Sequence, residues 1–234
     1  MAMLSSCAPT YIPNKFHAPF LQNNGDIEAE VAMNNSNGIE FGTAYALTNH
    51  LGIIVDGNLQ LFKFHDSNYT RNRFIESGLG YFDNFGEKGI TEVYGGFGYG
   101  NSDAWTTDEY GGPTDMRLEK ISGNYFRAFL QFELGVAFGR TPETENSGIE
   151  MGLIYRPVYV SMFNYHQSDI TFATGNMETN SGSSSALFHE LGCFIRIMGN
   201  NLGVELQSGY SLPSSNIIFQ GNFLIASIGI VYRR

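Results

Sequence analysis

Residues 200–212 read NNLGVELQSGYSL, and side chains of opposite character alternate along this segment. Successive side chains of an extended chain point to opposite faces, so the segment has one apolar face and one small or polar face. The apolar face carries Leu202, Val204, Leu206 and Tyr210, and the opposite face carries Gly203, Glu205, Gln207 and Gly209. A soluble barrel encloses its apolar face, whereas a membrane barrel turns that face toward lipid. The identity of the enclosed face therefore distinguishes the two.

The same alternation continues from Gly25 to the C-terminus and predicts an all-β chain of ten strands without a helix. The predicted strands span residues 25–33, 38–47, 51–64, 71–82, 89–99, 120–138, 148–165, 186–198, 201–211 and 216–232. Most of them are long enough to cross a bilayer, which takes about 9–11 tilted residues.

The predicted connections differ in length in a regular way. Those after the second, fourth, sixth and eighth strands are mostly short, whereas residues 101–115 and 166–185 are long and polar. If consecutive strands are antiparallel neighbours, the short turns and both termini lie at one end and the long loops lie at the other. This asymmetry is typical of outer-membrane barrels.

Composition also favours a membrane barrel. Charged residues make up 15% of the 234 residues, against about 25% in soluble domains. The mean hydropathy is −0.15, and we find no apolar run of the roughly 20 residues that a transmembrane helix needs. The formal net charge of −10 argues against a nucleic-acid partner, because phosphate groups require a basic surface.

The face opposite the bulky apolar residues is rich in glycine and in acidic residues. Glycine weakens a strand but suits the crowded, concave inside of a narrow barrel, so we assign this face to the lumen. The inward acids are then Glu28, Glu30, Glu40, Asp56, Glu76, Glu92, Glu133, Glu150, Glu190 and Glu205, and the inward bases are Arg127, Arg156 and Arg196. The resulting formal charge inside the barrel is −7.

These charges predict a network in the lumen. We expect arginine side chains to bridge several glutamate pairs, and other glutamates to hold protons, water or cations. The expected members are Glu76, Glu92, Arg127, Glu133, Glu150, Arg156, Glu190, Arg196 and Glu205. The alternative is that the network only fills the barrel and fixes the register of its strands.

With these features, residues 25–234 resemble the small outer-membrane β-barrel superfamily. The last residues, SIGIVYRR, are similar to the insertion signal of such barrels at Ser227, Gly229 and Tyr232, but Arg234 stands where the signal normally ends in an aromatic residue. The resemblance implies a closed, antiparallel, up-and-down transmembrane barrel of about ten strands. It also implies the outer membrane of a Gram-negative-type bacterium, with extracellular long loops and periplasmic termini.

The N-terminal sequence MAMLSSCAPTYIPN resembles the lipobox of a lipoprotein in its LSSC segment. This resemblance implies that Cys7 is lipidated and that residues 1–6 are the remnant of a signal peptide. Three prolines and the sequence LQNNG predict that residues 7–24 form an extended tether rather than part of a core.

Several functions remain open at this point. The favoured one is a structural or surface-binding role, in which residues 101–115, with Trp105 and Tyr110, and residues 166–185 make the contacts. The alternatives are a narrow cation-selective pore, an outer-membrane enzyme that modifies lipid or cleaves protein, and a soluble lipocalin-like ligand-binding barrel. The expected partners are the lipid bilayer and a surface ligand or membrane-protein complex.

An enzyme reading rests on two polar segments near the long-loop end. Nucleophile and base side chains occur there, but no spacing fixes their geometry. The candidates are His65, Asp66 and Ser67 in the first segment and His166, Ser168 and Asp169 in the second. We therefore assign no catalytic residue, and we expect neither a cofactor nor a metal site.

Overall fold

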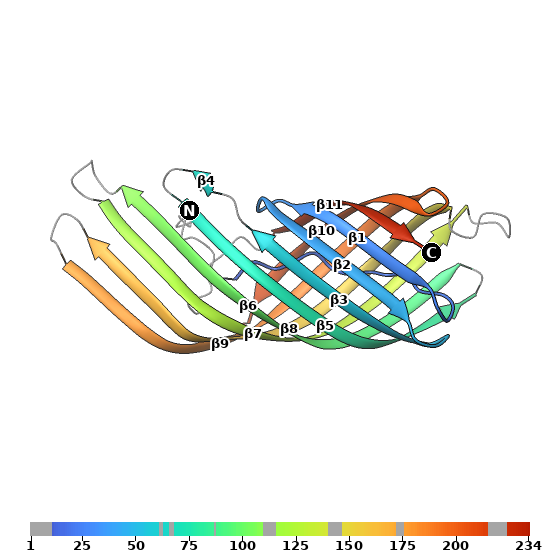
Figure 1. The fold of residues 1–234 in the computed structure, drawn as a ribbon, viewed down its shortest axis with the longest axis horizontal. Helices are drawn as coiled ribbons and strands as arrows, with labels where there is room; N and C mark the ends of the chain where they lie inside the picture. Colours follow the sequence, from blue (N-terminus) through green and yellow to red (C-terminus); the bar gives the residue numbers. More distant parts are fainter. Residues whose placement is uncertain are drawn as a thin grey trace.

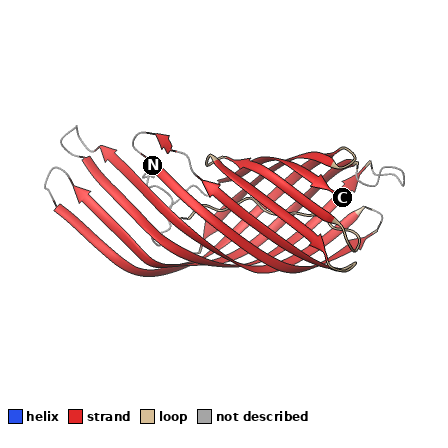
Figure 2. Ribbon diagram, viewed as in Figure 1, coloured by secondary structure: helices blue, strands red, loops and turns tan. Residues whose placement is uncertain are grey.

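The structure is a computed structural model that describes residues 11–60, 63–65, 68–86, 88–109, 116–139, 147–171, 176–214 and 224–234. These residues form strands and connecting segments (Figure 2). The strands are β1 (Ile27–Asn34), β2 (Gly38–Ala46), β3 (Leu51–Gln60), β4 (Lys63–His65), β5 (Asn68–Phe85), β6 (Gly89–Glu109), β7 (Met116–Phe138), β8 (Gly148–Thr171), β9 (Asn176–Met198), β10 (Leu202–Pro213) and β11 (Leu224–Arg233). Within the described ranges, no helix is long and apolar enough to cross a membrane.

Ten of these strands close into a barrel. Neighbours in the sheet are antiparallel, β3 pairs with β5, and β1 pairs with β11 to complete the ring. The three-residue strand β4 pairs with the first residues of β5 and is not one of the ten strands of the barrel. Closure satisfies the backbone hydrogen bonds that a bilayer leaves without water. The predicted ten-stranded transmembrane barrel is confirmed.

The polar face of the strands is the enclosed one. Phe132 and Leu206 are 40% and 49% exposed, whereas Glu133 and Glu205 are 3% and 2% exposed. Large apolar side chains thus cover the outside of the barrel and carboxylates lie inside. The alternative of a soluble lipocalin-like barrel is therefore wrong, because such a barrel encloses its apolar face.

The barrel wall has two heights. Strands β1, β2, β3, β10 and β11 contain 8–12 residues, whereas β5–β9 contain 18–24. The long strands project past the short ones at the left of Figure 1, at the end opposite the C-terminus. We call this the long-strand end, and we call the end with the turns after β2, β5, β7 and β9 the short-turn end.

The two predicted long loops are wrong for most of their length. Residues 101–109 belong to β6, and residues 166–171 and 176–185 belong to β8 and β9. The prediction failed because it followed the alternation of apolar and polar residues. Outside the bilayer, paired strands need no apolar face, because their backbone hydrogen bonds alone continue the sheet. Such polar strands lack the alternating pattern and therefore resemble loops in sequence.

The apolar outer surface marks the part of the wall that lies in lipid. At the long-strand end, its continuous part on β6–β9 ends at Tyr99, Phe126, Tyr159 and Leu187. Beyond them most outward side chains are polar, such as Ser122 and Lys120 on β7, and the exposed large apolar residues Trp105 and Met177 stand apart from that surface. We call the part beyond this boundary the projecting sheet: residues 101–109 of β6, 116–124 of β7, 161–171 of β8 and 176–185 of β9.

A bulge bends β8 within the projecting sheet. The pairing of β8 with β9 shifts register between Met162 and Tyr165, and Asn164 has a φ of 52°. Asparagine adopts this left-handed conformation more readily than most residues, and a bulge increases the local bend and twist of a strand. A shallow groove lined by residues 163–166 and 181–183 lies beside the bulge.

The membrane boundary predicts how charge is tolerated along one strand. Leu206→Arg places a charge on the outward face near the middle of β10 and should lower the free energy of unfolding by about 2–4 kcal/mol. Leu202→Arg, at the short-turn end of the same strand, is the control and should cost about 0–1 kcal/mol. Urea unfolding in phospholipid vesicles measures both. Equal costs would contradict the proposed depth of Leu206.

Candidate functional site: the occupied lumen

The lumen of the barrel is filled by the chain's own N-terminal segment. Every residue from Tyr11 to Leu21 is buried, although the segment forms neither helix nor strand. The hydroxyl of Tyr11 donates a hydrogen bond to Glu190 (3.0 Å), and the backbone N–H of Leu21 donates one to Glu92 (3.1 Å). We call residues 11–21 the plug. Figure 1 shows it as the dark blue segment inside the outline of the barrel.

The course of the plug corrects two sequence-based expectations. Residues 11–21 are buried in the core of the barrel, whereas the sequence predicted a tether that is not part of a core. Leu21 lies toward the short-turn end, near the start of β6, whereas Tyr11 contacts Phe188 and Tyr125 toward the long-strand end. The described chain therefore begins and ends at opposite ends of the barrel. The tether was expected because prolines and polar residues give no periodic signal.

Side chains of the wall satisfy the backbone of the plug, which has no strand to pair with. The N–H of Lys15 donates to both carboxylate oxygens of Glu40 (3.1 Å each). Gln207 accepts a hydrogen bond from the N–H of Phe16 (2.9 Å) and donates one to its carbonyl (2.8 Å). Gln131 donates to the carbonyl of His17 (2.6 Å). Buried backbone groups without such partners would be costly, so these polar side chains allow the plug to remain irregular.

Glycines in the wall make room for the large side chains of the plug. A Cβ atom at Gly192 would overlap the ring of Phe16. One at Gly135 would lie 2.5 Å from the ring of Phe20. The inward glycines that the sequence assigned to space for charged side chains thus also give space to aromatic rings.

Two arginines organise the ion pairs nearer the short-turn end. Arg196 contacts Glu28 (3.0 Å) and Glu150 (3.1 Å), and it also donates to Glu205. Arg233 pairs with the same Glu28 and Glu150. Each guanidinium also reaches a plug carbonyl, namely that of Ala18 for Arg196 (2.8 Å) and that of Pro19 for Arg233 (3.2 Å). The wall charges and the plug therefore form one hydrogen-bonded unit.

A second pair of arginines organises the lumen nearer the long-strand end. Arg127 lies 3.6 Å from Glu76 and 3.5 Å from Glu190. Arg156 donates to Glu190 through Nε (2.7 Å) and to the carbonyl of Asn14 through Nη2 (2.9 Å). The side-chain amide of Asn14 donates to Glu76 (2.9 Å). The plug again completes contacts that the wall arginines leave open.

The nine residues assigned to the lumen network are all buried inside the barrel. The structure joins seven of them in the two arginine-centred groups just described. Glu92 and Glu133 lie opposite each other on β6 and β7, and among the described contacts Glu92 accepts a hydrogen bond from the plug. Their role in function remains a proposal.

Sequence reasoning missed three further charged or chargeable groups in the lumen: Lys15, His17 and Arg233. Strand parity would have found Arg233, because it falls on the same face as Gly229. The two plug residues had no comparable signal. In the described part of the chain, five fixed cations face ten buried acids, so a formal excess of five negative charges remains before His17 is counted.

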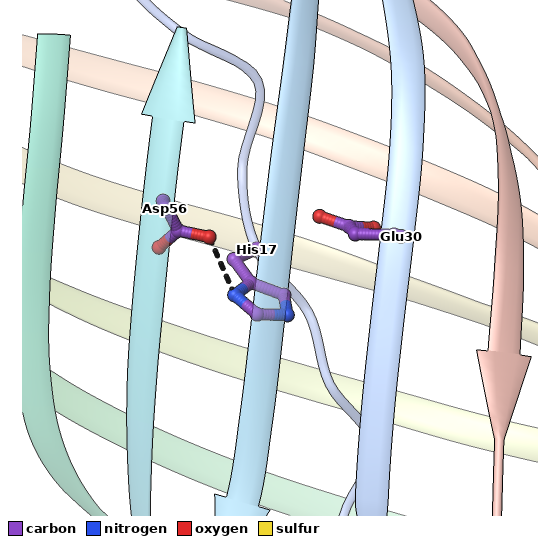
Figure 3. Close-up of side chains that lie close together, drawn as sticks. All are labelled: His17, Glu30 and Asp56. Carbon is purple, nitrogen blue, oxygen red and sulfur yellow. Dashed lines mark ion pairs between the residues drawn. The ribbon is translucent and has the colours of Figure 1, made fainter.

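His17 lies between carboxylates of two wall strands (Figure 3). Its Nδ1 atom is 2.6 Å from Oδ1 of Asp56, and Glu30 lies on its other side. Burial disfavours a positive charge on the His17 ring, whereas the two neighbouring carboxylates favour it.

Other residues singled out from the sequence lie outside the lumen or outside the described residues. Trp105 lies on β6 in the projecting sheet and is 39% exposed. His166 lies in β8 and is exposed. Cys7, Asp66, Ser67 and Tyr110 fall outside the described residues, as do the side chains of His65 and Asp169.

Comparison with solved structures finds chains that are similar to this one at low sequence identity. The translocator domain of the autotransporter NalP from Neisseria meningitidis is 11% identical with a TM-score of 0.46, and the match covers 89% of this chain and 87% of that one. Ail, the attachment invasion locus protein of Yersinia pestis, is 10% identical with a TM-score of 0.31, and the match covers 90% of this chain and 99% of that one. A major outer membrane protein from Thermus thermophilus is 12% identical with a TM-score of 0.35, and the match covers 89% of this chain and 98% of that one. No protein-family model and no curated protein matches the chain.

The contact between Gly192 and the ring of Phe16 predicts how the plug can be displaced. We expect Gly192→Val to make residues 11–21 sensitive to protease, because the new side chain takes the space of the Phe16 ring. Gly95→Val is the matched control, since a Cβ there lies no closer than 3.5 Å to a neighbouring side chain. Limited proteolysis of the detergent-folded proteins, read by mass spectrometry, measures the effect.

The same pair of variants reports on the lumen through conductance. We expect no channel steps in planar bilayers for the parent protein and Gly95→Val, and cation-selective steps for Gly192→Val, because acidic side chains would line the vacated space. If the plug is equally protected from protease in both variants, the result contradicts the packing of Phe16 against Gly192.

Proposed function

We propose that this protein is a closed outer-membrane barrel that holds the projecting sheet outside the bilayer as a binding surface for another macromolecule. The observation that carries the proposal is the length of β6–β9 beyond the apolar outer surface. On β6, residues 101–109 follow Tyr99 without a break in pairing with β7. The nine residues 101–109 add about 30 Å of strand to residues 89–99 of β6, which are already long enough to cross a bilayer.

The outer face of the projecting sheet supports a binding role because it is polar and ordered by side-chain contacts. The side chain of Asn101 donates to that of Asn124 (3.1 Å), and Lys120 lies 3.8 Å from Asp103. Trp105 is paired opposite Lys120 in the ladder. A partly exposed tryptophan among polar groups is a common centre of a protein interface.

The edge of the projecting sheet offers a second means of contact. Residues 176–186 of β9 pair with β8, and in the described parts of the chain no strand pairs with their other edge. An open strand edge can accept an extended segment of another protein by strand addition. The sequence here, rich in Ser, Asn and Thr, is polar enough to remain in water.

The plug argues against an open pore as the function of this state. It occupies the lumen from Tyr11 to Leu21 and is tied to the wall by buried ion pairs and hydrogen bonds. A conducting path would require these contacts to break. The enzyme alternative stays a prediction, because Asp66, Ser67 and the side chains of His65 and Asp169 lie outside the described residues.

We also propose the orientation and the lipid attachment that the sequence resemblance implies, with one revision. The short-turn end would face the periplasm and the projecting sheet would face the exterior. Cys7 precedes Tyr11 by four residues, a reach of at most about 14 Å. Since Tyr11 lies toward the long-strand end, a lipid on Cys7 would lie on that side of the barrel and not at the short-turn end.

A photocrosslinking experiment tests the binding role. We replace Trp105 in the projecting sheet, and separately Leu206 on the lipid-facing wall, with p-benzoylphenylalanine and irradiate native membranes. We expect protein adducts from position 105 and lipid adducts alone from position 206, because only the former would face a macromolecular partner. The same crosslinker is then placed at residues 101 and 120. If no protein adduct forms from position 105, 101 or 120, the result contradicts a binding role for this surface.

Lipidation is tested by metabolic labelling with an alkyne-tagged fatty acid. We expect the label on the parent protein and on Cys193→Ser, and its loss from Cys7→Ser, because Cys193 is a lipid-facing wall residue without the lipobox context. An unmodified N-terminal peptide in the mass spectrum of the parent protein would refute attachment at Cys7.

A further inference from the structure

His17, Glu30 and Asp56 meet where the plug crosses strands β1, β2 and β3. Glu30 on β1 and Asp56 on β3 are both paired with Gly42 on the intervening strand β2. A Cβ atom on Gly42 would lie 2.7 Å from an oxygen of each carboxylate. The missing side chain therefore lets two carboxylates from non-adjacent strands approach each other over the middle one (Figure 3).

The imidazole of His17 faces this pair of carboxylates from the plug. One ligand atom from each of His17, Glu30 and Asp56 can be chosen so that all three lie within 4.8 Å of one another. The Nε2 atom of His17 and the Oε2 atom of Glu30 have no hydrogen-bond partner among the described residues. Both residues are almost fully buried, at 2% and 3% exposure. Buried polar atoms without partners are rare and require an explanation.

We propose that His17, Glu30 and Asp56 bind one divalent transition-metal ion, with Zn²⁺ the type expected, and that this ion joins the plug to the barrel wall. One imidazole nitrogen and two carboxylate oxygens suit Zn²⁺, whereas Ca²⁺ and Mg²⁺ prefer oxygen ligands alone. Zinc–ligand distances are about 2.0–2.2 Å. The three groups must therefore move closer together, and the flexible side chain of Glu30 is the one able to do so.

The charge around the cluster also favours a divalent ion. Glu76 is paired opposite Asp56 in the sheet, and Glu28 adds to the negative charge that acts on His17. Lys15 is the cation that contacts Glu30. Lys15 also reaches Glu205 (3.2 Å), so it keeps an anionic partner if Glu30 turns to a metal.

The position of the site determines how it would be filled. All three side chains are buried between plug and wall, so the ion would enter while the barrel closes around the plug. The absence of a metal site from the sequence-based expectations follows from the assignment of His17 to a tether. No spacing in the sequence relates residue 17 to residues 30 and 56.

The experiment refolds the whole chain in detergent with Zn²⁺, removes free metal on a chelating resin, and measures bound zinc by mass spectrometry. We expect about one zinc per chain in the parent protein and in the control His189→Ala, which removes a histidine of the outer wall. His17→Ala and Asp56→Asn should retain less than about one tenth as much, because each loses a ligand. Refolding with Ca²⁺ should leave no stoichiometric ion.

Heat-modifiable gel mobility shows which proteins have folded. A folded parent protein without zinc, or folded His17→Ala with as much zinc as the parent, would overturn the proposal and leave an ordinary histidine–carboxylate ion pair. If the variants do not fold, the parent protein refolded with Cu²⁺ decides the question by electron paramagnetic resonance. Coupling of the copper to one imidazole nitrogen supports the site, and a spectrum without such coupling overturns it.

Discussion

Carboxylates enclosed in a narrow barrel are the constraint on which the rest of this structure depends. The outer wall must be apolar where it lies in lipid, so the charged side chains of that part of the strands are confined to the inside. Ten acids are buried there with four arginines of the wall. A charge removed from water is tolerated when it is paired and hydrogen-bonded, and the wall alone does not supply enough partners.

The plug supplies the missing partners. It brings Lys15 and His17 toward the acids of β1, β3 and β10, and its carbonyl groups accept hydrogen bonds from wall arginines. Its backbone N–H groups in turn are held by Glu40 and Glu92. Stability, occlusion of the lumen and the candidate metal site therefore share one cause, which is the need to balance negative charge in an enclosed space.

Much of the barrel could be predicted from the sequence because lipid imposes a strict pattern. The alternation around Leu206 and Glu205 correctly assigned the outer and inner faces, and it located most strand starts at the short-turn end. The pattern ended where the bilayer ended. Beyond Tyr99 no solvent-imposed alternation remained, and the continuing ladder of β6 was taken for a loop.

The candidate site could be predicted only in part. Parity assigned the wall charges to the lumen because strand geometry relates each residue to its neighbours by a fixed period. The contacts of Phe16 and His17 depend on where an irregular segment lies in three dimensions, and nothing in residues 11–21 specifies a period. Such long-range placement comes from charge balance and from space left by Gly192 and Gly42, which no local pattern encodes.

The position of the plug has a consequence for the order of assembly. Bulky residues such as Phe16 and Phe20 touch wall residues from β7 and β9, and the seam between β1 and β11 completes the ring. A finished ring would have to stretch for such a segment to be threaded through it. The sheet would instead fold around residues 11–21 before β1 and β11 pair. The plug would then act as a template that sets the width of the closing barrel.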